Sequence, residues 1–215
     1  MSKHARTYDR APDEWYVEPT RCTEQLIEVE PLPGVVLDPA CGQGNIVTTL
    51  LAAGIDAYGS DIRDRAGAPR WFLGQSDFLK DEPRILPDHI VCNPPFYRGE
   101  GTEAFIRRAL ELSVGKVCIF SQTTFLHGSA RAKGLYRTRA PDRVWIITPR
   151  QSCPPGHKLA AGEIEAKGGT TDWAWFVWDN HMPASMRNLP RLGWTNPEPH
   201  LRARQPAAAA ALQEA

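Results

Sequence analysis

The sequence lacks the features of membrane, secreted and metal-binding proteins. It has no apolar run of the roughly 18 residues that a membrane span needs, and its first ten residues contain no apolar signal core. Its five cysteines form no C-x-x-C pair and have no histidine at zinc-ligand spacing. We therefore expect a cytoplasmic protein with no metal, no disulfide framework and no membrane partner.

An excess of one charge is also absent, because 25 basic residues balance 25 acidic residues. The 42% hydrophobic and 23% charged residues are typical of a globular protein, and 215 residues suit a single domain. The basic residues are nevertheless concentrated in residues 121–158, where seven of them accompany one acid and give a local charge of +6. This segment indicates either a surface that attracts a phosphate backbone or an ordinary solvated face.

Short apolar runs alternate with amphipathic or glycine-punctuated stretches, which is typical of a doubly wound α/β domain with a mostly parallel sheet. The expected strands are 35–37, 56–60, 89–92, 116–120, 143–147 and 173–178, and the expected helices are 20–28, 45–53, 101–112 and 129–136. Residues 149–171 show no helical periodicity and are expected to form a long functional loop. The predicted catalytic domain covers 13–180, between an N-terminal extension (1–12) and a partly disordered C-terminal extension (181–215).

The first informative motif is a Gly-x-Gly turn that follows an apolar strand and opens a helix. Gly42 and Gly44 let the backbone approach a ligand closely, and Asp38 places a carboxylate beside them. This arrangement favours a ligand with a positively charged amino-acid part. The alternative is a turn that only joins a strand to a helix.

Further acidic residues follow at the ends of the next two strand-like segments. Asp61 comes 17 residues after Gly44, near the position at which a nucleoside-binding unit accepts hydrogen bonds from ribose hydroxyls. Asp77 can accept from an adenine amino group while Phe78 flanks the base. Each acid alone is as easily explained as a cap or turn residue, but together they indicate one crevice above the sheet.

The segment Asn93-Pro94-Pro95-Phe96 follows another apolar strand and should lie at the same edge of the sheet. If the Asn93 side-chain oxygen and the Pro94 carbonyl accept hydrogen bonds from a planar amine, its lone pair becomes available and its developing positive charge is stabilised. Phe96 can stack on the base, worth on the order of 1 to 3 kcal/mol. A catalytic base and a cysteine nucleophile are not needed. The alternative is a strand-terminating turn.

These motifs resemble those of the class I S-adenosylmethionine-dependent methyltransferases, and within them the amino-methyltransferases of DNA. DPACGQG (38–44), Asp61, Asp77-Phe78 and NPPF (93–96) occur in the family's order, and WYVEPT (15–20) resembles the segment that lines the methionine pocket. The resemblance implies a Rossmann-like methyltransferase with a seven-stranded sheet and one antiparallel strand. It also implies S-adenosylmethionine bound by Tyr16, Thr20, Asp38, Ala40, Gly42, Gly44, Asn45, Asp61, Ile62, Asp77, Phe78 and Asn93.

The favoured acceptor is N6 of adenine in DNA, presented as a single-stranded or flipped-out base. Phosphate contacts are expected from Arg131, Lys133, Arg137 and Arg139, and stacking or wedge contacts from Trp71, Tyr97 and Trp173. Adenine N6 in RNA and the glutamine amide of a protein are alternatives, because they need the same two acceptors. A non-catalytic nucleotide-binding module is a third hypothesis. The target sequence, the choice between adenine N6 and cytosine N4, and the oligomeric state are left open.

Overall fold

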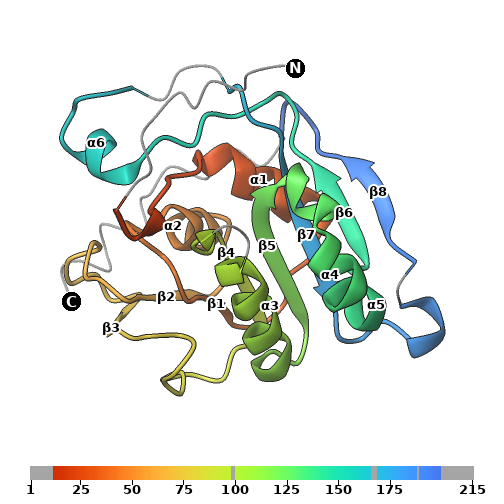
Figure 1. The fold of residues 1–215 in the computed structure, drawn as a ribbon. Coiled ribbons are helices and arrows are strands. Elements are labelled where there is room, and N and C mark those ends of the chain that lie inside the picture. The colour runs from red at the N-terminus through yellow and green to blue at the C-terminus, as the bar shows by residue number, and fades with distance from the viewer. Residues whose placement is uncertain (1–11, 98–99, 166–168, 188, 200–215) are drawn as a thin grey trace.

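The computed structural model of the chain describes residues 12–97, 100–165, 169–187 and 189–199. Its centre is an eight-stranded sheet with the strand order β3-β2-β1-β4-β5-β7-β6-β8 (Figure 1). The strands are β1 (Val36–Asp38), β2 (Ala57–Asp61), β3 (Phe72–Gln75), β4 (His89–Cys92), β5 (Lys116–Gln122), β6 (Arg143–Ile146), β7 (Trp173–Asp179) and β8 (Arg191–Trp194). Only β7 runs antiparallel to its neighbours β5 and β6. The predicted α/β class and the antiparallel strand are confirmed.

Helices cover both faces of the sheet. The α-helices are α1 (Thr20–Val29), α2 (Asn45–Ala52), α3 (Glu100–Leu112), α4 (Ser129–Lys133), α5 (Leu135–Arg139) and α6 (Gly156–Ala160), and the 3₁₀ helices are η1 (Pro12–Glu14), η3 (Thr123–His127) and η4 (Ala184–Met186). Helices α1 and α2 pack against one face, and α3 and α5 against the other.

The core is divided between the two faces because successive strand residues point in opposite directions. In β1, Val36 packs with α1 and α2, whereas the next residue, Leu37, packs with α3. All four residues of β4 are buried, as are the first six of β7. Such strands are covered on both sides, which explains why they appear in the sequence as continuous apolar runs.

The sheet has one strand more than the expected seven. Strand β3 lies at one edge and β8 at the other (Figure 1). Neither contains a fully buried residue, so neither gave an apolar run that the sequence pattern could reveal. Strand β8 lies within the expected C-terminal extension and pairs in parallel with β6.

Two local expectations were wrong. The single helix expected over 129–136 is two short helices, because Gly134 between them has φ −108° and ψ −99°, which is not helical. The expected loop 149–171 contains α6, whose first residue, Gly156, donates its N–H to the Trp15 carbonyl. No helix in the four described ranges is long and apolar enough to cross a membrane.

Candidate active site

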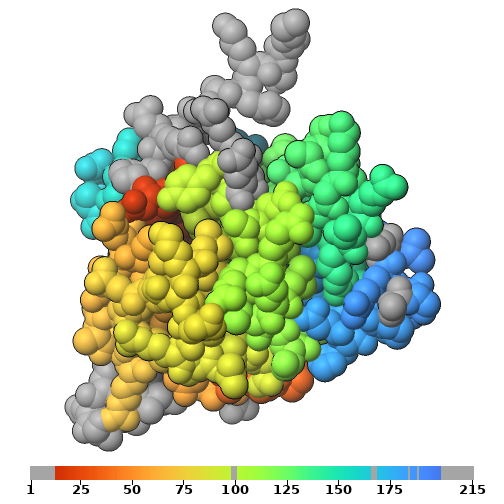
Figure 2. Space-filling model, turned by 60° about the horizontal axis from the view of Figure 1, so that its bottom comes forward, coloured from red at the N-terminus to blue at the C-terminus, as the bar shows by residue number. Residues whose placement is uncertain are grey.

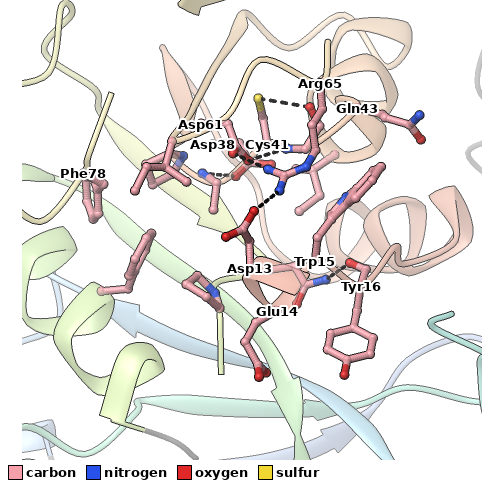
Figure 3. A pocket seen from close by; sticks show the side chains of 18 of the residues that line it. Asp13, Glu14, Trp15, Tyr16, Asp38, Cys41, Gln43, Asp61, Arg65 and Phe78 are labelled. Atoms are coloured by element: carbon pink, nitrogen blue, oxygen red, sulfur yellow. Dashed lines mark hydrogen bonds and ion pairs between the residues drawn. The ribbon is translucent and has the colours of Figure 1, made fainter. Parts of the chain in front are cut away.

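A pocket of about 240 Å³ opens where β1, β2 and β4 end (Figure 3). Asp38 is the last residue of β1, Asp61 is the last residue of β2, and Asn93 directly follows β4. The strands are parallel, so their carboxyl ends meet at the same edge of the sheet. Helix η1 forms another side of the pocket. Ligands of doubly wound sheets bind at such an edge.

The glycine turn is shaped by two indole rings. Gly42 and Gly44 have φ values of 54° and 91°, which disfavour any side chain. A Cβ on Gly42 would lie 2.8 Å from the Trp15 Nε1 atom, and one on Gly44 would lie 2.2 Å from the Trp71 ring. Both glycines are therefore required by packing as well as by backbone conformation.

Asp61 holds this turn in place rather than projecting freely. Its Oδ2 atom accepts from the Gly42 N–H at 2.8 Å, and its Oδ1 atom accepts from the Arg63 N–H at 2.9 Å and from Arg65 Nη1 at 2.8 Å. Arg65 also pairs with Asp13 of η1 at 3.0 Å and lies over the Trp15 ring, 4.8 Å from its centre (Figure 3). Arg65 thus connects η1 to the cofactor side of the pocket.

Six acidic side chains line the pocket, against one basic side chain, Arg65. The acids are Asp13, Glu14, Glu18, Asp38, Asp61 and Asp77. Burial raises the pKa of Asp38 well above its ordinary value, and the Glu18 carboxyl raises it further. Burial also raises the pKa of Glu18, to about 7. The pocket therefore has an excess of negative charge that a cationic ligand would relieve.

Asn93 has a fixed orientation and one unused acceptor. Its Nδ2 group donates to the Tyr16 carbonyl at 2.9 Å and to Glu18 Oε2 at 2.7 Å. Because the Tyr16 carbonyl can only accept, the amide nitrogen must face it, and the oxygen must point the other way. The Oδ1 atom is buried and has no hydrogen-bond partner among the described residues. Five other buried side-chain atoms among the described residues also lack a partner, but only Asn93 among these residues lines the pocket, where a ligand can supply the donor.

The remaining residues of the turn have different surroundings. Pro95 lines the pocket, and its carbonyl accepts a long hydrogen bond from Thr102 Oγ1 at 3.5 Å. Phe96 packs between Tyr16 and Trp173, with 5.9 Å between ring centres on each side.

Tyr97, not Phe96, is the aromatic residue of this segment that lines the pocket. Its side chain is 49% exposed and its φ is 35°. Gly101 of α3 leaves room for the ring, since a Cβ there would lie 2.7 Å from Tyr97 Cδ2. A non-glycine residue with positive φ is strained and is found preferentially at functional sites. Tyr97 is therefore a second aromatic candidate for contact with an acceptor.

The structure brings most of the predicted site residues to one pocket. Those that line it are Tyr16, Asp38, Ala40, Gly42, Asn45, Asp61, Ile62, Asp77, Phe78, Asn93 and Pro95. Thr20, Gly44, Pro94 and Phe96 do not line it. Asp77 pairs with Lys80 at 2.7 Å, which lowers the Asp77 pKa, and Phe78 packs on Phe105 with 5.0 Å between ring centres.

Two of the four expected phosphate-binding residues have structural contacts instead. Arg131 donates to the Phe125 carbonyl at 2.8 Å and lies over the Phe125 ring, 4.2 Å from its centre. Arg139 pairs with Asp142 at 3.0 Å, and its side chain is only 14% exposed. Both guanidinium groups are held against the protein, so fewer of the seven basic side chains of this segment are free to contact phosphate than the sequence suggests.

The other two residues, Lys133 and Arg137, are exposed on α4 and α5. In Figure 2 these green helices lie at the upper right, whereas the red η1 segment, which borders the pocket, lies at the upper left, and α3 lies between them. A nucleic acid that crosses this face from these helices to the pocket would therefore pass over α3.

Comparisons with known proteins support the fold. No protein-family model and no curated protein matches the chain. Among solved structures, the chain is similar to a candidate RNA methyltransferase from Pyrococcus horikoshii, with TM-score 0.57, 15% identity, and 77% of this chain and 86% of the other covered. It is also similar to the type I restriction enzyme EcoKI M protein, with TM-score 0.57, 9% identity, and 83% and 47% covered.

A third similar structure is the modification subunit of a candidate type I restriction enzyme from Vibrio vulnificus, with TM-score 0.53, 13% identity, and 79% and 45% covered. The chain therefore spans about half the length of the two restriction subunits. At these identities the similarity shows the fold alone. The chain has the Rossmann-like methyltransferase fold.

Proposed function

We propose that the protein is an S-adenosylmethionine-dependent methyltransferase that acts on an exocyclic amino nitrogen, most specifically N6 of adenine in DNA. The observation that carries this proposal is the unpaired, buried Asn93 Oδ1 atom beside an acid-lined pocket. Carboxylates suit a positively charged methyl donor, and an unused acceptor oxygen suits a neutral amine. The two would meet at the carboxyl edge of the sheet.

The residues present fit the cofactor. S-adenosylmethionine carries an ammonium group and a sulfonium group, and it supplies an electrophilic methyl group when bound. Asp38, which lies in the pocket without a basic partner there, would hold the cationic part. Asp61 Oδ2, which accepts one hydrogen bond from the Gly42 N–H, would accept a second from a ribose hydroxyl, and Phe78 would flank the adenine. An unfavourable concentration of buried negative charge is the structural reason for a cationic ligand.

The protein's contribution to the reaction is to orient the acceptor amine and stabilise its charge. The Asn93 Oδ1 atom would accept an N–H of the amine and draw the nitrogen lone pair out of conjugation with the ring. As the nitrogen becomes positive, the same oxygen would stabilise that charge, and it costs no reorganisation because Tyr16 and Glu18 already fix the amide. The aromatic ring of Tyr97 would contact the flat face of the base.

DNA is proposed as the acceptor on two grounds. Two of the similar structures are the M protein of the type I restriction enzyme EcoKI and the modification subunit of a candidate type I restriction enzyme, which favours DNA for this chain. Lys133 and Arg137 also place two exposed positive charges near α3, where they could contact phosphates. RNA is the second candidate, because the structure from Pyrococcus horikoshii reaches the same TM-score and is covered over 86% of its length.

The test is methyl transfer from a donor labelled in its methyl group to single-stranded DNA, duplex DNA, RNA and a protein extract, followed by hydrolysis and chromatography of the nucleosides. We expect label in N6-methyladenine from DNA, with single-stranded DNA at least as good as duplex. Label in RNA alone would show that the acceptor is RNA, the second candidate, and not DNA. Label in protein alone, or in no acceptor, would overturn the proposal. Asp56→Asn, at an exposed position that directly precedes β2 and so lies at the sheet edge opposite the pocket, is the activity control.

A further inference from the structure

Glu18 is a buried carboxylate that forms no salt bridge within the described part of the chain. It lies just before α1, is 6% exposed, and its Oε2 atom is 2.7 Å from Asn93 Nδ2. Resting on the proposed function, we propose that Glu18 is a positioning residue that acts through Asn93. It fixes the amide with its oxygen toward the acceptor and makes that oxygen a stronger hydrogen-bond acceptor.

The backbone around Glu18 is anchored from two sides. The Glu18 carbonyl accepts from Asn45 Nδ2 at 2.9 Å, which ties it to the first residue of α2. The preceding Val17 N–H donates to the Pro154 carbonyl at 3.0 Å, which ties it to the loop before α6. The backbone of Glu18 therefore cannot move away from Asn93 without breaking contacts with two other elements.

The Asn93 Nδ2 group has two acceptors, and Glu18 differs from the other one, the Tyr16 carbonyl, by its charge. Tyr16 offers a neutral carbonyl, which is enough to orient the amide nitrogen. A carboxylate that accepts from the same nitrogen forms a stronger, charge-assisted hydrogen bond and polarises the amide, which places more negative charge on Oδ1. That oxygen is the atom left unpaired. The additional charge would stabilise the positive nitrogen of the transition state more than the neutral amine of the ground state.

The neighbours of Glu18 give it no compensating cation. The titratable groups that interact with it are Asp38, from the end of β1, and the thiols Cys22, Cys92 and Cys153, from α1, β4 and the loop after β6. No basic side chain pairs with Glu18 within residues 12–97, 100–165, 169–187 and 189–199. Its pKa of about 7, raised by burial, places the loss of its charge within the range of an activity assay.

The pH dependence has a definite sign. Turnover needs the ionised carboxyl, so kcat/KM should rise with pH through the pKa of the free enzyme, near 7, and then level off. In Glu18→Gln the amide oxygen can still accept from Asn93, but the charge is gone at every pH. We therefore expect this variant to lose the acidic limb of the profile and to have kcat at saturating cofactor reduced at least about tenfold.

The matched control is Glu30→Gln. Glu30 is as buried as Glu18, at 1% exposed, but its partners are Lys116, Arg143 and Trp145. Lys116 and Arg143 begin β5 and β6, so they lie at the sheet edge opposite Asn93, which follows the end of β4. This control should keep the wild-type kcat and the acidic limb, even if the protein becomes less stable. Glu18→Asp, which keeps the charge but shortens the side chain, should lower kcat and retain the limb. It also provides the test if Glu18→Gln fails to fold.

Two results would overturn the inference: Glu18→Gln with a kcat within twofold of wild type, or an acidic limb that persists unchanged in that variant. If Glu18→Gln does not fold, a Glu18→Asp variant with wild-type kcat would overturn it. Failure of the proposed function is a separate outcome, because it would appear as a wild-type protein that methylates no DNA, RNA or protein.

Discussion

The buried charge of Glu18 gives a quantitative prediction about stability without ligand. Burial raises its pKa from 4.5 to about 7 in the folded protein. Each unit of pKa corresponds to about 1.4 kcal/mol, so ionisation of this carboxyl destabilises the ligand-free protein by about 3 kcal/mol. The cost is absent below pH 4.5, grows between pH 4.5 and 7, and is complete above pH 7. Glu18→Gln should therefore stabilise the ligand-free protein at alkaline pH.

The assay is urea denaturation followed by tryptophan fluorescence, at pH 5 and at pH 8.5, on wild type and Glu18→Gln. Substitution also changes hydrogen bonding, but this change is common to both pH values, so the difference between them isolates the charge. We expect the variant to gain about 2 to 3 kcal/mol more at pH 8.5 than at pH 5. A variant that is destabilised equally at both pH values would refute the reasoning. A site that is more stable without its functional carboxylate is a common trade-off.

Three further predictions concern the glycine turn, the cofactor and the basic helices. Gly44→Ala should lower stability by about 2 kcal/mol or more, measured by denaturation, because its methyl group would collide with Trp71; unchanged stability would contradict this packing. Cofactor affinity, measured by calorimetry, should rise with pH, because burial raises the pKa of Asp38 and a cationic ligand favours its ionised form. S-adenosylhomocysteine, which lacks the sulfonium charge, should respond less, and an equal response would be contrary evidence. Arg139→Ala should destabilise the protein by about 3 kcal/mol, because it leaves the buried Asp142 carboxylate without its partner. Lys133→Ala, at an exposed position, should weaken DNA binding with little effect on stability. A stable Arg139→Ala variant, or a Lys133→Ala variant that loses stability, would contradict this.

The sequence predicts the centre of the sheet well, and its edges poorly. Strands β4, β5 and β7 are buried on both faces, so their residues must be apolar, and apolar runs are what a sequence pattern detects. Strands β3 and β8 pair on one side only and are partly exposed, so their composition is not constrained in the same way. Their pairing depends on the neighbouring strand, which local sequence does not contain.

The same distinction applies to the site. Asp38, Asp61 and Asn93 could be predicted because each directly follows a recognisable strand, and the topology of a parallel sheet brings such positions together. Glu18 and Arg65 were not predicted as site residues, because their contacts join segments that are distant in the chain. An acid directly after the apolar and aromatic residues WYV (15–17) was the available signal for Glu18.

The basic segment shows the limit of counting charges. The sequence gives the number of arginines, but not which of them are paired within the protein. Arg143 contacts Glu30 and Asp179, which lie 113 and 36 residues away, and Arg139 contacts Asp142. Glu30 and Asp179 lie outside the segment, whereas Asp142 is the one acid within it. The net charge of a short stretch therefore does not represent the charge of the surface it forms.

The most direct test of the account is single-turnover methyl transfer by wild type and Asn93→Ala, with cofactor binding measured on the same samples. The account predicts that Asn93→Ala binds S-adenosylmethionine within a few-fold of wild type but transfers the methyl group at least about a hundredfold more slowly, because an oxygen that stabilises the transition state is missing. Wild-type rates in Asn93→Ala, with label still appearing in N6-methyladenine, would contradict it.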